Sequence, residues 1–214
     1  MEKMEPAFRL GMSAPEVLIE LVRINSDIEA TFFKTYIPTK NLMEEPFAAT
    51  PLLFSVERLQ RHNPTHEDIF WLKREAINLQ ALEAIIESFS EEERVLAVTS
   101  KVKTFSLKEL LHIPMMDFSC EISAANLERI QAFLKGIGQA GLILETGRSY
   151  HFYGTGLLTK DEHSLFIGKC LLFTGYTDSR YIGHQLIDGL TALRISAGKT
   201  RSSLMPTVVG IITI

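Results

Sequence analysis

The sequence predicts an α+β protein, and three observations support this interpretation. From residue 112 onward, β-branched stretches alternate with amphipathic ones in the order strand, helix, strand, strand, helices, strand and a final strand. The tetrapeptide "TGRS" at 146–149 separates two strand-like stretches and predicts a hairpin. The first hundred residues are richer in helical spacing. We therefore expect a core over residues 101–214 and a helical region over residues 1–100 that packs on it.

In the first hundred residues, the stretch 14–24 has apolar residues at helical spacing, with Ser13 placed to cap it and Pro15 in its first turn. Residues 29–37, "EATFFKTYI", are β-branched and aromatic and predict a strand. The longest helical pattern covers 65–89, where Asn63 or Thr65 could cap a packing helix. Its apolar side would carry Trp71, Leu72, Leu79, Leu82, Ile85 and Ile86.

The later elements follow from alternation, capping residues and turns. A strand is expected at 94–102 and a short helix at 106–112. Ser123 would cap one helix, and Thr159 with Glu162 forms a capping box for another. The expected core elements are a strand at 112–120, a helix at 123–138, hairpin strands at 140–145 and 150–154, helices at 159–173 and 178–189, and strands at 191–196 and 206–214. This is an RRM-like βαββαβ layout with a mainly antiparallel sheet, one face of which is left available for a site.

Composition limits the classes of protein that fit. Hydrophobic residues make up 46% and charged residues 22%, which is ordinary for a globular domain. No apolar run reaches the roughly 18 residues needed to span a bilayer, and the N-terminus has no signal-peptide pattern, so we expect a cytoplasmic protein with no membrane partner. Cys120 and Cys170 have no Cys or His at ligand spacing, which predicts buried thiols.

The net charge of −4 argues against a polycation that binds along a nucleic acid backbone, although a local phosphate site is compatible with it. Strand alternation places Asp117 and Ser119 on one face of their strand, and Ser149 and His151 on one face of the hairpin. Asp188, Arg194 and Lys199 come from the segment around the next strand. These positions are the candidate site.

Three stretches carry a family resemblance: "PMMDFSCE" at 114–121, "GRSYHFYG" at 147–154 and "LIDGLTALRISAGK" at 186–199. Together they resemble the motifs of the archaeo-eukaryotic primase-polymerase superfamily, in its single-domain, primase 1D-like branch. In that family a strand ends in Asp-x-Asp or Asp-x-Glu, a later strand carries Ser-x-His, and a third segment brings an Asp followed by Arg and Lys. The resemblance covers about residues 112–210.

The resemblance implies a protein that binds nucleoside triphosphates and nucleic acid at a Mg²⁺ or Mn²⁺ site, as a nucleotidyltransferase if it is active. By position, Asp117 and Asp188 would be the catalytic metal ligands. The triphosphate would be held by Ser149, His151, Arg194 and Lys199. Ser119 stands where the family has its second carboxylate. Glu121 is the candidate replacement ligand, on the same face if the strand continues.

Plainer interpretations stay open for the same residues. Asp117 could cap the following helix or sit in a turn, and His151 could be a hydrogen-bonded sheet histidine without function. Because Ser119 stands in place of the family's second carboxylate, a degenerate site that binds a nucleotide or nucleic acid without turnover is also compatible with the sequence. A non-catalytic interaction module, or an α+β protein that binds a small apolar ligand, is the alternative function.

Overall fold

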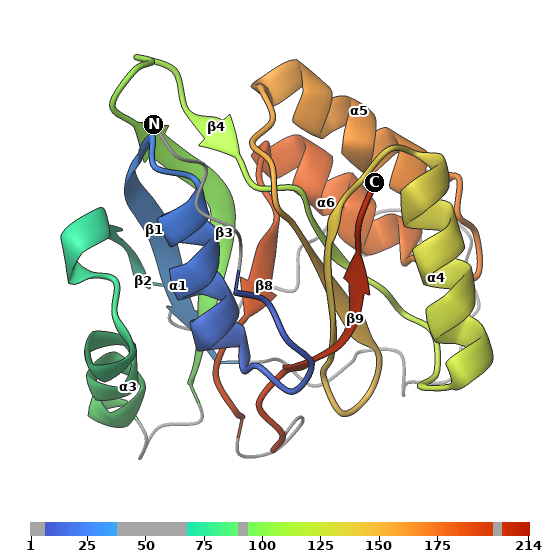
Figure 1. Ribbon diagram of the computed structural model, residues 1–214, viewed down its shortest axis with the longest axis horizontal. Helices are drawn as coiled ribbons and strands as arrows, with labels where there is room; N and C mark the ends of the chain where they lie inside the picture. The colour runs from blue at the N-terminus through green and yellow to red at the C-terminus, as the bar shows by residue number, and fades with distance from the viewer. Residues whose placement is uncertain (1–6, 38–67, 90–93, 199–202) are drawn as a thin grey trace, which may run out of the picture.

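The computed structural model describes residues 7–37, 68–89, 94–198 and 203–214, and within them the chain forms two antiparallel sheets (Figure 1). The core sheet has the order β5 (Met115–Asp117), β7 (Tyr150–Gly154), β6 (Gly141–Glu145) and β9 (Thr207–Ile212). The N-terminal sheet has the order β2 (Asp68–Lys73), β1 (Ile28–Tyr36), β3 (Val95–Thr104) and β4 (Leu111–His112). Strand β8 (Ala192–Arg194) also pairs with β3. The α+β class with mainly antiparallel pairing is therefore confirmed.

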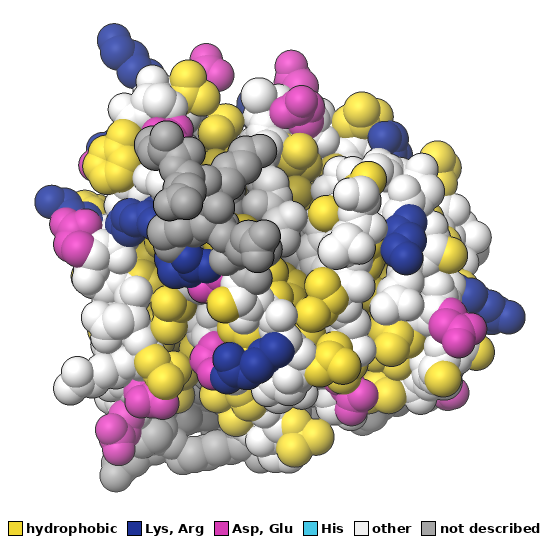
Figure 2. All heavy atoms as spheres, viewed as in Figure 1, with side chains coloured by type: hydrophobic (Ala, Val, Ile, Leu, Met, Phe, Trp, Pro, Cys, Tyr) yellow, Lys and Arg dark blue, Asp and Glu magenta, His cyan; other side chains and the backbone are white. Residues whose placement is uncertain are grey.

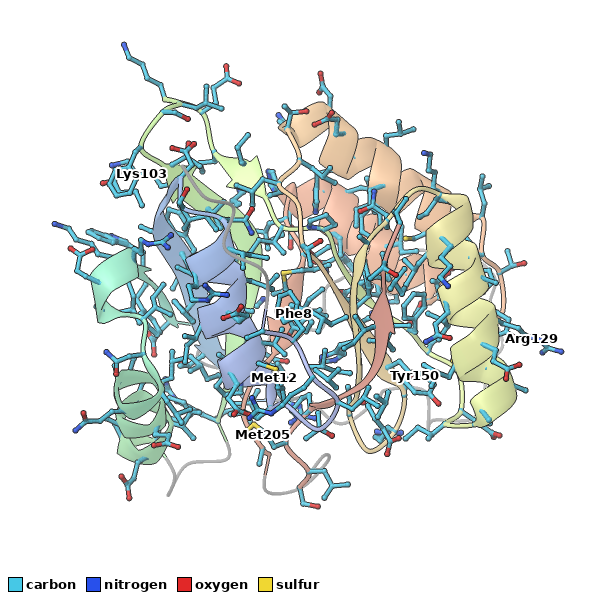
Figure 3. All side chains as sticks on the ribbon, in the orientation of Figure 1. Phe8, Met12, Lys103, Arg129, Tyr150 and Met205 are labelled. Atoms are coloured by element: carbon cyan, nitrogen blue, oxygen red, sulfur yellow. The ribbon has the colours of Figure 1, made fainter. Side chains whose placement is uncertain are left out.

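Three helices cover one face of the core sheet. The helices α4 (Ala124–Gly136), α5 (Lys160–Leu171) and α6 (Ser179–Asp188) pack on the face that carries Met116, Ile143 and Phe152. Tyr150 of β7 is on this side too, and Figure 3 shows it directed towards α4, where its hydroxyl accepts from Ser123 N at 2.9 Å. The other face packs against the N-terminal sheet and α1 (Ala14–Ile24), which lies in front of β1 and β3 in Figure 1. The face expected to be open is thus covered over most of its area.

Local sequence signals account for most of the boundaries. Ser13 and Glu16 form a capping box at α1, and Thr159 and Glu162 form another at α5. The Ser123 hydroxyl accepts from Asn126 N at the start of α4, as its position in the sequence predicts. The hairpin of β6 and β7 and the strands at β1, β3 and β9 are also where the sequence places them.

The prediction of a long helix over 65–89 is wrong. The described part of this stretch forms β2, a short 3₁₀ turn (η2, Arg74–Ala76) and the helix α3 (Leu79–Ser88). Phe70 and Leu72 point into the core while Ile69 and Trp71 point out, a period of two that places these residues on a strand. Asn78, whose side chain accepts from Ala81 N, starts the helix. The caps suggested at residues 63 and 65 lie outside the described residues.

Two further expectations are corrected by strand pairing. Residues 106–112 do not form a helix, because the stretch ends in β4, which pairs with Lys101 and Val102 of β3. Strand β8 joins the N-terminal sheet rather than the core sheet, and β9 adds to the core sheet beside β6. The domain boundary expected at residue 100 falls within β3. This strand pairs with β1, which precedes residue 100 in the sequence, and with β8, which follows it. That boundary and the RRM-like assignment stay predictions.

None of the helices in the described ranges has the length and hydropathy needed to cross a membrane.

A pair of stacked histidines joins β4 to α5. The rings of His112 and His163 have centroids 4.3 Å apart and planes inclined by 20°, and His112 Nδ1 lies 3.1 Å from Ser100 Oγ. Burial is the main cause that lowers the pKa of His112 to about 4 and that of His163 to about 3. His163 Nε2 is buried, and no hydrogen-bond partner for it lies within the described ranges. Both rings are therefore neutral at pH 7.

This pair predicts a specific loss of stability in acid. Because both folded pKa values lie below the ordinary value of 6.5, the unfolded chain binds more protons once the pH falls below 6.5. This stability is present above pH 6.5 and is lost as the pH falls towards 3, by on the order of 3 kcal/mol for each histidine. We expect His163→Leu and His163→Gln both to flatten this dependence in urea unfolding at pH 7 and pH 4.5. Only the leucine variant should keep the stability at pH 7, and an unchanged acid slope in both would contradict the prediction.

Candidate functional site

Asp117 and His151 are neighbours across paired strands. Asp117 ends β5 and is in register with His151, the second residue of β7. His151 Nε2 lies 3.6 Å from Asp117 Oδ1. The sequence neighbours Met116 and Phe152 pack among the helices, so alternation turns Asp117 and His151 to the opposite face of the core sheet.

Protein surrounds this pair, yet solvent still reaches it. The Asp117 side chain is 45% exposed and that of His151 is 7% exposed. Despite its exposure, desolvation is the main cause that raises the pKa of Asp117 to about 7, while Asp178 raises it further and Arg194 lowers it. The two facts fit a carboxylate at the bottom of a concave surface. Desolvation also lowers the pKa of His151 to about 3, so the two side chains do not form an ion pair at pH 7.

The imidazole of His151 lacks the hydrogen bonds that a structural histidine would make. Its Nδ1 is buried and has no hydrogen-bond partner among the described residues. The 3.6 Å from Nε2 to the Asp117 carboxylate is too long for a hydrogen bond. A buried polar group in this state costs free energy unless a ligand or water satisfies it. The described protein contacts therefore do not support the interpretation of His151 as a hydrogen-bonded sheet histidine.

Arg194, at the end of β8, anchors the segments around the site. Its guanidinium donates to the carbonyls of Ser196, Leu204 (3.0 Å) and Thr146 (3.3 Å), and the residue is 8% exposed. These carbonyls belong to the chain between β8 and β9 and to the β6–β7 turn. Strand β8 lies close to β5, so the positive charge acts on both Asp117 and His151. Arg194 is thus a fixed cation beside the carboxylate.

Three further side chains belong to the site but were not singled out by sequence. Asp178 caps α6, where its Oδ1 accepts from Arg180 N and Tyr181 N, and its charge raises the pKa of Asp117. In the part of the chain that the structure describes, the buried hydroxyls of Tyr153 and Tyr181 have no hydrogen-bond partners, and desolvation raises the pKa of both. In the sequence, Asp178 carries only an N-cap signal, and the two tyrosines read as ordinary strand and helix residues.

Ser149 lies in the turn before β7 and has a structural bond. Its hydroxyl donates to the carbonyl of Phe118. It therefore ties the hairpin turn to the segment that leaves β5. Its role as a phosphate contact stays a prediction.

The remaining predicted site residues are Glu121, Asp188 and Lys199. The strand does not continue to Glu121, because β5 ends at Asp117 and the next residues pair with 176–177. Glu121 is exposed, and its carbonyl accepts from the Asn126 side chain at the start of α4. Asp188 is the last residue of α6, about 15 Å along the helix from the cap Asp178. Lys199 lies outside the described residues.

The donor set limits what metal chemistry the site allows. A two-ion centre needs several carboxylates around ions about 4 Å apart. In the described ranges, no cluster of three or more His, Cys, Asp and Glu side chains is placed to hold an ion. A two-metal centre therefore does not fit these residues. One hard cation on Asp117, with phosphate oxygens as its other ligands, fits the same chemistry.

Comparison with known proteins gives one match. The family model "AEP-like: Archaeo-eukaryotic primase 1D-like" matches residues 75–207, more than half of the chain. No curated protein and no solved structure matches. The matched range includes β5, β7, α6 and β8, the four elements that position the site. The chain therefore belongs to the archaeo-eukaryotic primase 1D-like family.

Proposed function

We propose that this protein binds a nucleoside triphosphate through one Mg²⁺ or Mn²⁺ ion at Asp117, beside a nucleic acid strand, and does not transfer the nucleotide. One observation carries the proposal: the partly exposed carboxylate of Asp117 lies beside the buried imidazole of His151, and the Nδ1 of that imidazole has no hydrogen-bond partner among the described residues. Membership of a primase-like family gives the ligand class. Perturbed titratable groups of this kind are commonest at functional sites.

The charges of the site suit this ligand. A cation on Asp117 would offset the cost of ionising that carboxylate in its desolvated position. The fixed charge of Arg194 favours an anion nearby, and a neutral His151 can donate one N–H to a phosphate oxygen. Each of these groups is thus complementary to a metal-bound triphosphate.

The absence of turnover follows from the carboxylate count. Ser119, at the position of the family's second acid, offers only a neutral hydroxyl, and its backbone N–H is bonded to Tyr176 O. Asp178 is engaged in capping α6. Asp117 is then the one carboxylate left to bind metal. The site therefore lacks ligands for a second ion, the one that would activate an attacking hydroxyl.

Nucleotide binding is tested by titrating a fluorescent nucleoside triphosphate with and without Mn²⁺. We expect Mn²⁺-dependent binding that Asp117→Asn weakens at least about tenfold, the order of magnitude for a lost charged contact. The matched control is Asp161→Asn, an exposed acid on α5, which should bind like the parent. Equal binding by both variants would reject the site, and loss of binding in Glu121→Gln would restore that residue as a ligand.

The absence of turnover is tested separately, by primer synthesis and primer extension with Mg²⁺ and with Mn²⁺. We expect no product with either ion. Product that disappears in Asp117→Asn would overturn this part of the proposal while supporting the site itself.

A further inference from the structure

Two buried tyrosine hydroxyls near Asp117 lack hydrogen bonds. Tyr153 is the fourth residue of β7 and is fully buried, and Tyr181 is the third residue of α6. Neither hydroxyl has a partner among the described residues. Because an unsatisfied buried hydroxyl lowers stability, its presence at both positions points to a bond that forms only when a ligand is bound.

The Asp117 carboxylate has the complementary deficiency. Its Oδ1 lies 3.6 Å from His151 Nε2, beyond hydrogen-bonding distance, and no donor in the described ranges bonds to either oxygen. Carboxylates that bind metal ions are themselves usually hydrogen-bonded, which fixes their orientation. The site thus contains a carboxylate without a donor and two hydroxyls without an acceptor.

Strand register turns Tyr153 towards the side of the core sheet that carries Asp117. Asp117 is in register with His151, and Tyr153 follows His151 by two positions on β7, so all three side chains share one face. Tyr153 is the diagonal neighbour of Asp117 across the paired strands, a separation that an aromatic side chain can bridge. The rings of His151 and Tyr153 have centroids 6.4 Å apart and planes inclined by 60°.

Tyr181 approaches the same carboxylate from α6. Its backbone N–H lies 3.4 Å from Oδ1 of the cap Asp178, whose charge acts on Asp117. Desolvation is the main cause that raises the pKa of Tyr153 and of Tyr181, and the charge of Asp117 raises both further. Both hydroxyls therefore keep their protons at pH 7 and are available as donors.

We propose that Tyr153 and Tyr181 are positioning residues, which donate to the Asp117 carboxylate oxygen that a bound Mg²⁺ or Mn²⁺ ion leaves free. Ion binding requires the ionised carboxylate, which is a stronger acceptor than the protonated one. The two hydroxyls then gain the bonds that they lack, and the carboxylate is held towards the ion. The inference rests on the proposed function for the presence of the ion.

The Mn²⁺ dependence of nucleotide binding reports on this site. In the part of the chain that the structure describes, no cluster of three or more His, Cys, Asp and Glu side chains offers a competing ion site. On the α1 side of the molecule, Figure 2 shows basic and acidic groups scattered without a patch of one sign. Asp117→Asn should therefore abolish the Mn²⁺ dependence.

The test measures the Mn²⁺ concentration that gives half-maximal binding of a fluorescent nucleoside triphosphate to the full-length protein. Tyr153→Phe and Tyr181→Phe should each raise this concentration about tenfold, the order of magnitude for a lost hydrogen bond to a metal ligand. The control is Tyr176→Phe, which removes a hydroxyl that accepts from Arg129 at 2.7 Å and should leave the value unchanged. An unchanged value in both site variants would overturn the proposal.

Stability separates a positioning role from a structural one. Because each site hydroxyl is unsatisfied in the metal-free protein, Tyr153→Phe and Tyr181→Phe should leave the urea midpoint unchanged or raise it. Tyr150→Phe removes a hydroxyl bonded to Ser123 N at 2.9 Å, so it should lower the urea midpoint without changing the Mn²⁺ requirement. Loss of stability that parallels the loss of Mn²⁺ response in the two site variants would overturn the proposal.

The absorption of the phenol rings gives a direct signature of the new bonds. Addition of Mg²⁺ with inorganic triphosphate should shift the tyrosine absorption of the parent protein to longer wavelength, because a hydroxyl becomes a donor to a carboxylate. The shift should be smaller in each site variant and absent in Asp117→Asn. A shift of full size in both Tyr153→Phe and Tyr181→Phe would assign it to other tyrosines and overturn the proposal.

The inference and the proposed function fail in distinguishable ways. If the parent protein binds nucleotide with Mn²⁺ and both site variants bind it equally well, the positioning role is rejected and the proposed function stands. If the parent protein shows no Mn²⁺-dependent binding, the proposed function is rejected, and the positioning role is rejected with it.

Discussion

Gly141→Ala is expected to destabilise the fold by about 3 kcal/mol or more, the range of severe core substitutions. A Cβ at Gly141 would lie 2.2 Å from the carbonyl oxygen of Tyr153 and 2.8 Å from the Cα of Gly154. Both are backbone atoms of the paired strand β7, so relief requires a shift of the core sheet. The measurement is the free energy of unfolding in urea, with the melting temperature as a second readout.

Gly168→Ala provides the matched control. Gly168 lies inside α5, and a Cβ there meets no heavy atom within 4 Å. Alanine is the better helix former, so this variant should gain about 0.5–1 kcal/mol. If the two alanine variants proved equally stable, the close approach of β6 to β7 would be contradicted.

Arg194→Met is the second large effect we expect, with a loss of about 3 kcal/mol. The substitution keeps an unbranched apolar stem but removes the donors to three carbonyls, two between β8 and β9 and one in the β6–β7 turn. Arg194→Lys should be intermediate, because one ammonium cannot reach all three carbonyls as a planar guanidinium does. Urea unfolding of the three proteins gives the comparison.

The Arg194 variant also predicts a change at Asp117. Because the guanidinium lowers the pKa of that carboxyl, its removal should raise this pKa above about 7, measured by carboxyl NMR in metal-free buffer. The control is Arg129→Met. Figure 3 shows Arg129 on α4 pointing away from the sheets, where it donates to Tyr176 Oη at 2.7 Å. That variant should lose less than about 1 kcal/mol and leave the Asp117 titration unchanged, and equal effects in both would reject the anchoring role.

Elements whose signals are local could be predicted from the sequence. The capping boxes of α1 and α5 depend on residues three apart, and the β6–β7 hairpin depends on one short turn. Residues 68–73 were mistaken for helix because Trp71 and Leu72 fit both periods, and only the pairing of β2 with β1 decides between them. The sheet that β8 joins could not be predicted for the same reason, because the sequence "TALRIS" does not indicate which strand it pairs with.

For the candidate site, too, local patterns predict some features, and long-range contacts decide the others. Alternation within β5 and β7 was enough to place Asp117 and His151 on one face, and the sheet register brings them together. Glu121 was misplaced because the chain leaves β5 after Asp117 to pair with residues 176–177. The part played by Asp178 could not be found, because a helix cap has the same sequence whether or not another carboxylate lies nearby.

The sequence alone determined the α+β class, most of the helices and strands, and the residues that carry the primase-like motifs. These properties depend on contacts between residues a few positions apart, and such contacts leave periodic or short-range patterns. Tertiary structure decided that two sheets form, that α1 covers the face expected to be open, and that Asp178, Arg194 and Tyr181 surround Asp117. Those outcomes depend on long-range packing and on desolvation, which is set by everything near a group in space and so leaves no local pattern in the chain.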